Sequence, residues 1–290
     1  MIRTALLAVF GLLFLAGPVL ARPGVDASFG PDGITLMEDS KPLLLYRTIS
    51  RDPGNQPGRE NYIHPLYAPD GTLISRDDPR ADHRGLFWAW SRVMVDGKSV
   101  ADGRMARSLT IFMREAHYEG HLDGSGVLTI RSDWIVNSAP ELVYVAEEIT
   151  RVHVYPGWDG SRRIELQTDI TPKVDGFAVA GDEQHPGDSG LSLNLASADQ
   201  MTVTSGGDTL QPSTEAADAG NTVNIGWNPG QPIAAWNVSM SCEVAGDRVS
   251  RWLVDHTGVT CVFPSGAPYL LVKGEALKLK ATIVIRGAHR

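Results

Sequence analysis

Residues 236–244 read W-N-V-S-M-S-C-E-V, with an apolar residue at every second position. Successive side chains of a β-strand point to opposite faces of a sheet, so this period of two predicts a strand with one buried face. Residues 277–285, L-K-L-K-A-T-I-V-I, repeat the pattern near the end of the chain. The spacing of three and four residues that marks an amphipathic helix is missing almost everywhere. The sequence therefore predicts an all-β fold with few or no helices.

Further alternating or apolar runs occupy residues 34–37, 43–46, 109–114 and 128–136, and most of the 30 Gly and 18 Pro fall between such runs. About twelve to sixteen strands cannot lie in one open sheet without curling or splitting. We therefore expect a large antiparallel two-sheet β-sandwich, of the supersandwich type, that spans residues 22–290 as a single domain. The polar residues 205–221 are expected to form a long surface loop.

The first 21 residues have the composition of a secretory signal peptide. A basic start at residues 1–3 is followed by an apolar stretch at residues 4–20 and by small residues at the end, where a signal peptidase cleaves. A membrane anchor is the alternative, although the apolar stretch is short and contains Gly17 and Pro18. We expect cleavage after Ala21 and a protein located in the bacterial periplasm or outside the cell.

The charge and the cysteines limit the partners and the redox chemistry. The chain has 26 Lys and Arg against 34 Asp and Glu, a net charge of −8, without a basic stripe that would bind nucleic acid. We expect no nucleic-acid partner and no membrane association after signal cleavage. The two cysteines, Cys242 and Cys261, are expected to form a disulfide in an oxidising compartment. Two unpaired core thiols are the alternative.

Residues 62–90, Y-I-H-P-L-Y-A-P-D-G-T-L-I-S-R-D-D-P-R-A-D-H-R-G-L-F-W-A-W, concentrate polar and aromatic side chains between turn residues. They include His64, His83, Arg76, Arg80, Arg84, Trp88 and Trp90. Such side chains on a loop that leads into a strand are suited to holding a polar ligand. The alternatives are core packing for the two Trp, a backbone-bonded loop position for the two His, and a surface ion pair for Arg76.

The segments H-P-L-Y-A-P-D-G (residues 64–71) and D-H-R-G-L-F-W-A-W (residues 82–90) resemble the bacterial PmoA-like family, which carries the label methane oxygenase. Weaker resemblance extends to residues 43–47, to Trp134 and to residues 147–148. Two positions where the family typically has His hold Arg80 and Asp82 here. The resemblance implies an exported β-sandwich protein in a setting of carbohydrate use. It does not imply methane oxidation, because no second apolar run of spanning length follows the signal.

Our first interpretation of the function is a carbohydrate-active enzyme, either a hydrolase, a lyase or an isomerase, that uses His and carboxylate groups as acid and base. Its expected ligand is a small molecule or an oligosaccharide, and no cofactor is expected. The candidate catalytic residues are His64, His83, Asp77 and Glu147. The candidate substrate-binding residues are Arg76, Arg84, Trp88, Trp90 and His185.

Two of these candidates lie outside the central segment. Glu147 belongs to an alternating strand in which Val143, Val145 and Ile149 are expected to point inward, so Glu147 is expected to point inward and to pair with Arg151. A structural ion pair at a sheet end is the alternative. His185 lies in an acidic turn-rich loop and could equally be a solvated tip.

Two other classes of function stay open. The alternating Glu115, His117, Glu119 and His121 are of the types that bind transition metals, but an exposed face of a sheet has the same pattern, and we expect no metal. A non-catalytic module that binds a saccharide or a partner is the alternative to the enzyme. The Arg and Asp at positions 80 and 82 favour it, because a binding cleft survives the loss of proton-transfer groups.

Overall fold

The computed structural model describes residues 24–49, 60–78, 83–138, 141–185, 187–196, 198, 201–227 and 236–287. These residues form β-strands joined by turns and loops, and no α-helix occurs among them, which confirms the predicted all-β class. Accordingly, no helix in this part of the chain is long and apolar enough to span a membrane. The expected signal peptide at residues 1–21 and the positions Arg80 and Asp82 lie outside the described residues.

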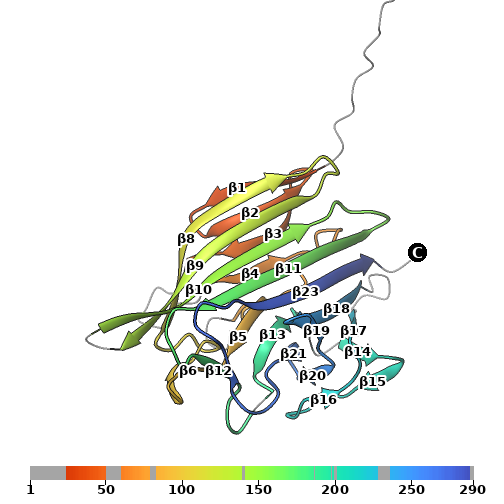
Figure 1. The fold of residues 1–290 in the computed structure, drawn as a ribbon. Helices are drawn as coiled ribbons and strands as arrows, with labels where there is room; N and C mark the ends of the chain where they lie inside the picture. Colours follow the sequence, from red (N-terminus) through yellow and green to blue (C-terminus); the bar gives the residue numbers. More distant parts are fainter. Residues whose placement is uncertain are drawn as a thin grey trace, which may run out of the picture.

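Two large antiparallel sheets dominate the described part of the chain (Figure 1). The nine-stranded sheet has the strand order β1-β2-β3-β4-β5-β13-β21-β20-β16. Its strands are β1 (Val25–Gly30), β2 (Gly33–Glu38), β3 (Lys41–Arg47), β4 (Tyr62–Leu66), β5 (Leu86–Trp90), β13 (Ser189–Asn194), β21 (Gly258–Val262), β20 (Arg251–Val254) and β16 (Ala217–Asp218).

The ten-stranded sheet has the order β15-β14-β17-β18-β23-β11-β10-β9-β8, with β19 paired to β18. Its strands are β15 (Asp208–Leu210), β14 (Met201–Ser205), β17 (Val223–Trp227), β18 (Trp236–Val244), β23 (Leu277–Gly287), β11 (Ser161–Pro172), β10 (Glu141–Val154), β9 (Gly126–Ser138), β8 (Leu109–Gly120) and β19 (Asp247–Arg248). A small sheet joins β22 (Tyr269–Leu270), β12 (Ala178–Ala180), β6 (Arg92–Val95) and β7 (Lys98–Ala101).

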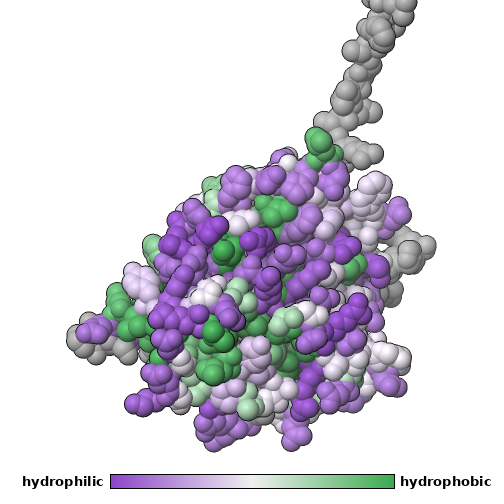
Figure 2. Space-filling view, in the orientation of Figure 1, coloured by the Kyte–Doolittle hydropathy of each residue, from purple (hydrophilic) through white to green (hydrophobic). Residues whose placement is uncertain are grey.

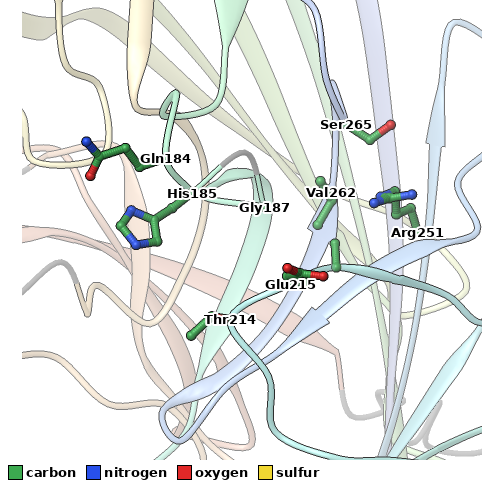
Figure 3. Close-up of a pocket in the computed structure, with 9 residues that line it drawn as sticks. Gln184, His185, Gly187, Thr214, Glu215, Arg251, Val262 and Ser265 are labelled. Atoms are coloured by element: carbon green, nitrogen blue, oxygen red, sulfur yellow. The ribbon is translucent and has the colours of Figure 1, made fainter.

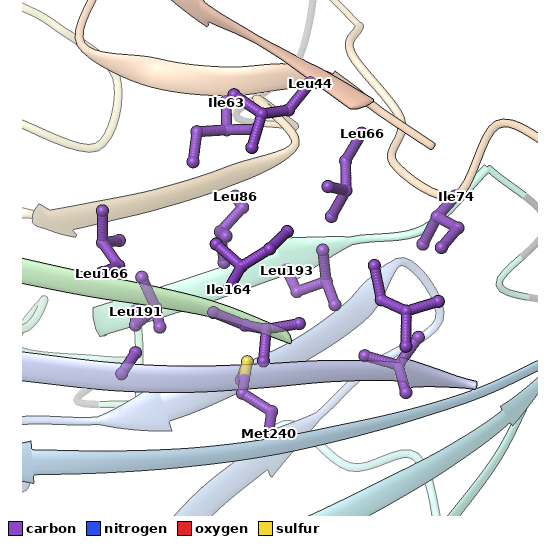
Figure 4. Close-up of a cluster of buried hydrophobic side chains, with 14 of the residues drawn as sticks. Leu44, Ile63, Leu66, Ile74, Leu86, Ile164, Leu166, Leu191, Leu193 and Met240 are labelled. Carbon is purple, nitrogen blue, oxygen red and sulfur yellow. The ribbon is translucent and has the colours of Figure 1, made fainter. Parts of the chain in front are cut away.

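Apolar side chains from the two large sheets meet in one core. Figure 4 shows Leu86 and Leu193 of the nine-stranded sheet near Ile164 and Met240 of the ten-stranded sheet, and all four are buried. The alternation in W-N-V-S-M-S-C-E-V places its apolar members on the buried face of β18. Burial of each large aliphatic side chain contributes about 1.5–3 kcal/mol of transfer free energy, so this core is the main source of stability. The predicted two-sheet sandwich is confirmed.

The expected disulfide is not formed, and the alternative of two buried thiols describes the structure. Cys242 lies on β18 and Cys261 on β21, so the two cysteines come from opposite sheets. Both side chains are buried in the shared core, and their thiols are close enough to hydrogen-bond. Burial, followed by the neighbouring Cys261 thiol, raises the pKa of Cys242 well above its usual value. In this environment a cysteine acts as a small apolar side chain.

The expected surface loop at residues 205–221 contains two short strands instead. β15 pairs with β14 at the edge of the ten-stranded sheet, whereas β16 pairs with β20 in the nine-stranded sheet. The segment therefore crosses from one sheet to the other. These strands have only three and two residues and are too short to show an alternating pattern, so the turn-rich composition of the segment predicted a loop.

Candidate functional site

The site is built on the outer face of the nine-stranded sheet, the face that points away from the core. Within β5, Leu86, Trp88 and Trp90 contact the core clusters, so the alternate residues Phe87 and Ala89 point outward. Tyr62 of β4 packs with these two residues in a separate small cluster. The two faces of this sheet therefore serve different purposes, one for the core and one for polar chemistry.

Cross-strand pairing lines up five outward side chains in a row that we call the outer row. The outer row consists of Arg47 on β3, Tyr62 on β4, Phe87 on β5, Ser192 on β13 and Thr260 on β21. Neighbouring strands lie about 4.8 Å apart, so adjacent members of the row are in contact range. The Ser192 and Thr260 hydroxyl oxygens are 2.8 Å apart, which confirms this proximity for one pair.

Buried arginines gather on this face. Four arginines of the described residues are buried. Three of them, Arg47, Arg84 and Arg104, lie here, and Arg162 belongs to the other sheet. The guanidinium carbons of Arg84 and Arg104 lie 4.5 and 6.0 Å from the centre of the Phe87 ring, and that of Arg47 lies 5.9 Å from the Tyr62 ring. Aromatic faces attract cations at such distances. These contacts with aromatic rings offset only part of the desolvation free energy of burying three charged side chains.

Arg84 holds the loop that covers the row. Its Nη2 donates to the carbonyl oxygen of Gly103 at 2.6 Å and also to that of Arg104. The backbone N–H of Gly103 donates to the carbonyl oxygen of Trp90, which ties the same loop to the end of β5. Arg104 Nη1 then reaches Ser192 Oγ at 3.2 Å. Arg84, predicted to bind substrate, thus positions Arg104 over the outer row.

Two carboxyl groups lie beside these arginines, Glu60 buried and Asp102 half-buried. Glu60 Oε1 accepts a hydrogen bond from the Ile111 N–H at 2.7 Å, and Asp102 Oδ1 accepts one from the Met105 N–H at 2.9 Å. Burial raises the pKa of both carboxyl groups, although the positive charge of Arg84 acts in the opposite direction on each. Titratable groups with perturbed pKa values gather at functional sites, so these two carboxyl groups are candidates for a role in the site.

His64 and Asp77, two of the predicted catalytic residues, lie next to the outer row. His64 Nδ1 is 2.9 Å from Ser75 Oγ, and Ser75 Oγ also accepts the Leu66 N–H at 2.8 Å, so the imidazole has a fixed orientation. Asp77 Oδ2 accepts a hydrogen bond of 3.0 Å from the Tyr62 hydroxyl. A histidine and a carboxylate of this kind can transfer protons to and from a bound ligand.

Gly85 allows the close approach on which this geometry depends. Its φ is +74°, and a Cβ atom added to it would lie 2.2 Å from the Ile63 carbonyl oxygen and 2.9 Å from His64 Cβ. Only glycine has both the conformational freedom and the missing Cβ that the position requires. Gly85 therefore sets the distance between the strand that carries His64 and the one that follows Arg84.

The other predicted residues of the segment have smaller roles. The Arg76 guanidinium pairs with Asp78 at 3.6 Å, and both side chains are about a third or more exposed, which matches the surface ion pair left open above. His83 accepts the Asp78 N–H through its carbonyl oxygen and so closes the loop before Arg84. Both residues shape the loop through their backbone groups, because the Arg76 carbonyl oxygen also accepts the Gly85 N–H.

Trp88 and Trp90 are core residues and do not reach the outer row. Their rings stack with centroids 6.3 Å apart and planes 14° from parallel, and Trp90 is fully buried. Trp90 Nε1 donates to the Phe263 carbonyl oxygen at 2.8 Å. The two Trp share one face of β5, as expected, but that face is the inner one, so the interpretation of ligand stacking is wrong for them.

Glu147 is not part of the site, and the expectation that it points inward is wrong. A β-bulge between Tyr144 and Ala146 shifts the alternation of β10, so Glu148 points inward in its place. Glu147 faces outward on the ten-stranded sheet, where it pairs with Lys173 at 2.6 Å and Arg114 at 2.9 Å. Figure 2 shows hydrophilic side chains over this face. The Lys173 hydrogen bond lowers the pKa of Glu147, the opposite of what a catalytic acid needs.

Its expected partner Arg151 pairs with Asp169 instead, at 3.0 Å. The inward Glu148 is a structural carboxylate: Asn61 Nδ2, Trp134 Nε1 and Thr150 Oγ1 donate to it at 2.6–2.9 Å. Those three donors satisfy the carboxylate within the core, which explains why it can be buried.

His185 lines a separate pocket of about 310 Å³ on the same sheet. Figure 3 shows the His185 ring on one side of the pocket and Glu215 and Arg251 on the other. Val262, which also lines it, follows Thr260 by two residues on β21, so the pocket begins about 7 Å from the end of the outer row. The structure thus places His185 beside the row and not within it.

Sequence reasoning missed several members of the site. Phe87 lies between Trp88 and the buried Leu86, and its position on the opposite face of β5 has no signal in the sequence. Glu60 precedes the conspicuous segment, and Arg104 stands in an ordinary D-G-R turn. Arg47 ends an apolar run and was noted only for the family resemblance. These residues come from four separate parts of the chain that the fold brings together, and no local sequence pattern indicates that they meet.

Comparison with known proteins gives a family for this fold. A model described as a family of unknown function, DUF6807, matches residues 33–289. The chain belongs to the DUF6807 family. No curated protein matches the chain. The match covers every member of the outer row, together with His64, Asp77 and Arg84, so the site described here lies within the part that defines DUF6807.

Proposed function

We propose that this protein is a carbohydrate-active enzyme, exported to the periplasm or the exterior of a bacterium, and that its site is the outer row with His64, Asp77 and Arg104. The observation that carries the proposal is the burial of Arg47, Arg84 and Arg104 on one face. Burying several charged side chains on one face costs desolvation free energy, so such a concentration marks a candidate functional site.

The proposed chemistry follows from the groups beside the row. His64 is held by Ser75 and acts as the proton-transfer residue. Asp77, which accepts a hydrogen bond from the Tyr62 hydroxyl, and the half-buried Asp102, whose pKa is raised by burial, are the candidates for the second acid or base. Arg104 donates hydrogen bonds to sugar hydroxyls. Hydrolysis, elimination and isomerisation of sugars all need such an acid and base pair.

The resemblance of residues 64–71 and 82–90 to the PmoA-like family supports the same location, because those residues supply His64 and Arg84. We propose that the DUF6807 and PmoA-like families are related through this segment. Methane oxidation is not part of the proposal. The exported location rests on the sequence of residues 1–21.

The test is a screen of the purified protein against soluble oligosaccharides, with product analysis by chromatography. His64→Asn should lower turnover of a converted glycan by about 10²-fold or more, the usual contribution of a general acid or base. The dissociation constant of the glycan should change by less than about threefold, since asparagine can also form hydrogen bonds and is similar in size to histidine.

His117→Asn is the matched control, because His117 is an exposed residue of β8 in the ten-stranded sheet, whereas the outer row lies on the nine-stranded sheet. This variant should convert the glycan at the rate of the unmodified protein. Binding of a glycan without any product, in the unmodified protein and both variants alike, would refute an enzyme and favour the non-catalytic module.

A further inference from the structure

Arg47 is a buried cation whose donors are not used. Its side chain is 4% exposed, and neither Nε nor Nη1 has a hydrogen-bond partner among the described residues. Its guanidinium carbon lies 5.9 Å from the centre of the Tyr62 ring. The equally buried Arg162 also has an unpartnered Nε, but its Nη1 donates to the Tyr67 carbonyl oxygen at 3.3 Å and its Nη2 pairs with Glu38 at 3.2 Å. Buried guanidinium donors almost always have partners, so an ion or ligand group is the expected explanation for Arg47.

A second unused donor lies on the same face. Asn194 Nδ2, in a side chain that is 3% exposed, has no hydrogen-bond partner in the described part of the chain. Asn194 lies on β13, two residues after Ser192 of the outer row, and its backbone N–H donates to Gly85. Three strand-to-strand steps separate β3 from β13, which is about 14 Å. One sugar ring does not span that width, whereas an oligosaccharide does.

The charges of this face favour an anion. Arg47, Arg84 and Arg104 supply three permanent positive charges. Burial raises the pKa of Glu60 and that of Asp102. Within the described residues no carboxylate pairs with Arg47. A buried positive charge of this kind favours an anionic ligand group at Arg47.

We propose that the ligand of this site is an acidic oligosaccharide and that Arg47 binds its oxyanion group. The inference rests on the proposed function for the sugar and on the unused Arg47 donors for the charge. Carboxylate groups of uronic acids and sulfate esters share the required chemistry, since both offer oxygen acceptors that match a guanidinium group.

The experiment measures binding by calorimetry to pairs of oligosaccharides that differ only in charge. Oligogalacturonate is compared with its methyl ester, and a sulfated chondroitin oligosaccharide with its desulfated and carboxyl-reduced forms, at constant ionic strength. Acetate and inorganic sulfate are included as anions without a sugar. At least one acidic oligosaccharide should bind tenfold or more tightly than its neutral counterpart, and the pair that responds identifies carboxylate or sulfate.

Arg47→Gln should remove that tenfold preference, and Arg47→Lys should restore part of it because the charge returns without the planar donor. Arg162→Lys, a matched change of an equally buried arginine, should leave the preference intact. The comparison of charged and neutral ligands in the unmodified protein stands even where an Arg47 variant does not fold.

The outcomes separate the two proposals. Equal affinity for acidic and neutral oligosaccharides, or an unchanged preference in Arg47→Gln, overturns the oxyanion site and leaves the carbohydrate function standing. Binding of acetate or sulfate that depends on Arg47, without binding of any oligosaccharide, supports the oxyanion site and overturns the carbohydrate function. An absence of binding by every oligosaccharide and anion overturns both.

Discussion

Gly85→Ala should destabilise the protein more than the same change at any open glycine with similar backbone angles. Gly85 has φ +74°, and its added Cβ would stand 2.2 Å from the Ile63 carbonyl oxygen. The left-handed backbone costs a non-glycine residue about 1–2 kcal/mol. Displacing strand β4 to relieve the clash costs a further ~1–3 kcal/mol, as in other overpacked sites. The expected loss is therefore about 2–5 kcal/mol of unfolding free energy.

Gly97 is the matched control, because its φ is +75° and no atom lies within 4 Å of the position of an added Cβ. Gly97→Ala should lose only about 1–2 kcal/mol, the backbone part. Urea unfolding followed by tryptophan fluorescence measures both losses. Because His64 Cβ is also within 2.9 Å of the added atom, Gly85→Ala should weaken ligand binding and Gly97→Ala should not. Equal losses of stability in the two variants would refute the close approach of β4 to Gly85.

Three further predictions concern other parts of the molecule. Cys242 and Cys261 should not react with a thiol reagent in the native protein, and two thiols should react after unfolding; one disulfide and no thiol after unfolding would contradict the structure. Burial raises the pKa of Glu60 above its usual value of 4.5 in the folded protein. The contribution of this carboxyl group to the unfolding free energy is therefore present below pH 4.5 and is lost as pH rises through the folded-state pKa. Glu60→Gln should remove this dependence, so that urea unfolding shows the variant gaining stability relative to the unmodified protein from pH 4 to pH 8; parallel pH profiles would exclude the role of burial. Glu147→Gln should change the unfolding free energy by less than about 1 kcal/mol and leave turnover unchanged, since Glu147 forms surface ion pairs, and a loss of turnover would return Glu147 to the site.

The fold was predictable from the sequence because its strands are long and alternate. The runs at 236–244 and 277–285 became β18 and β23, each with its apolar face in the core. The same rule failed for β10, where a bulge between Tyr144 and Ala146 exchanged the faces. A bulge adds one residue to a strand without a compositional signal. A strict period of two therefore assigns the residues after the bulge to the wrong face of the sheet.

The sequence singles out some residues of the candidate site and not others. His64, Asp77 and Arg84 lie together because they are close in sequence and Asp77 pairs with Arg84 in a β-bridge. Arg47 and Ser192 join them through the pairing of β3, β4, β5 and β13, and Arg104 joins them through a loop that Arg84 holds. Pairing between strands distant in sequence depends on the whole fold, and a single sequence carries no local signal of it.

The most direct test of the site is a crystal structure of the protein with the best oligosaccharide ligand of the binding screen. The ligand should lie on the outer face of the nine-stranded sheet, in contact with Arg47, His64 and Arg104. A ligand found in the His185 pocket alone, or on the ten-stranded sheet, would contradict the assignment of the outer row as the site.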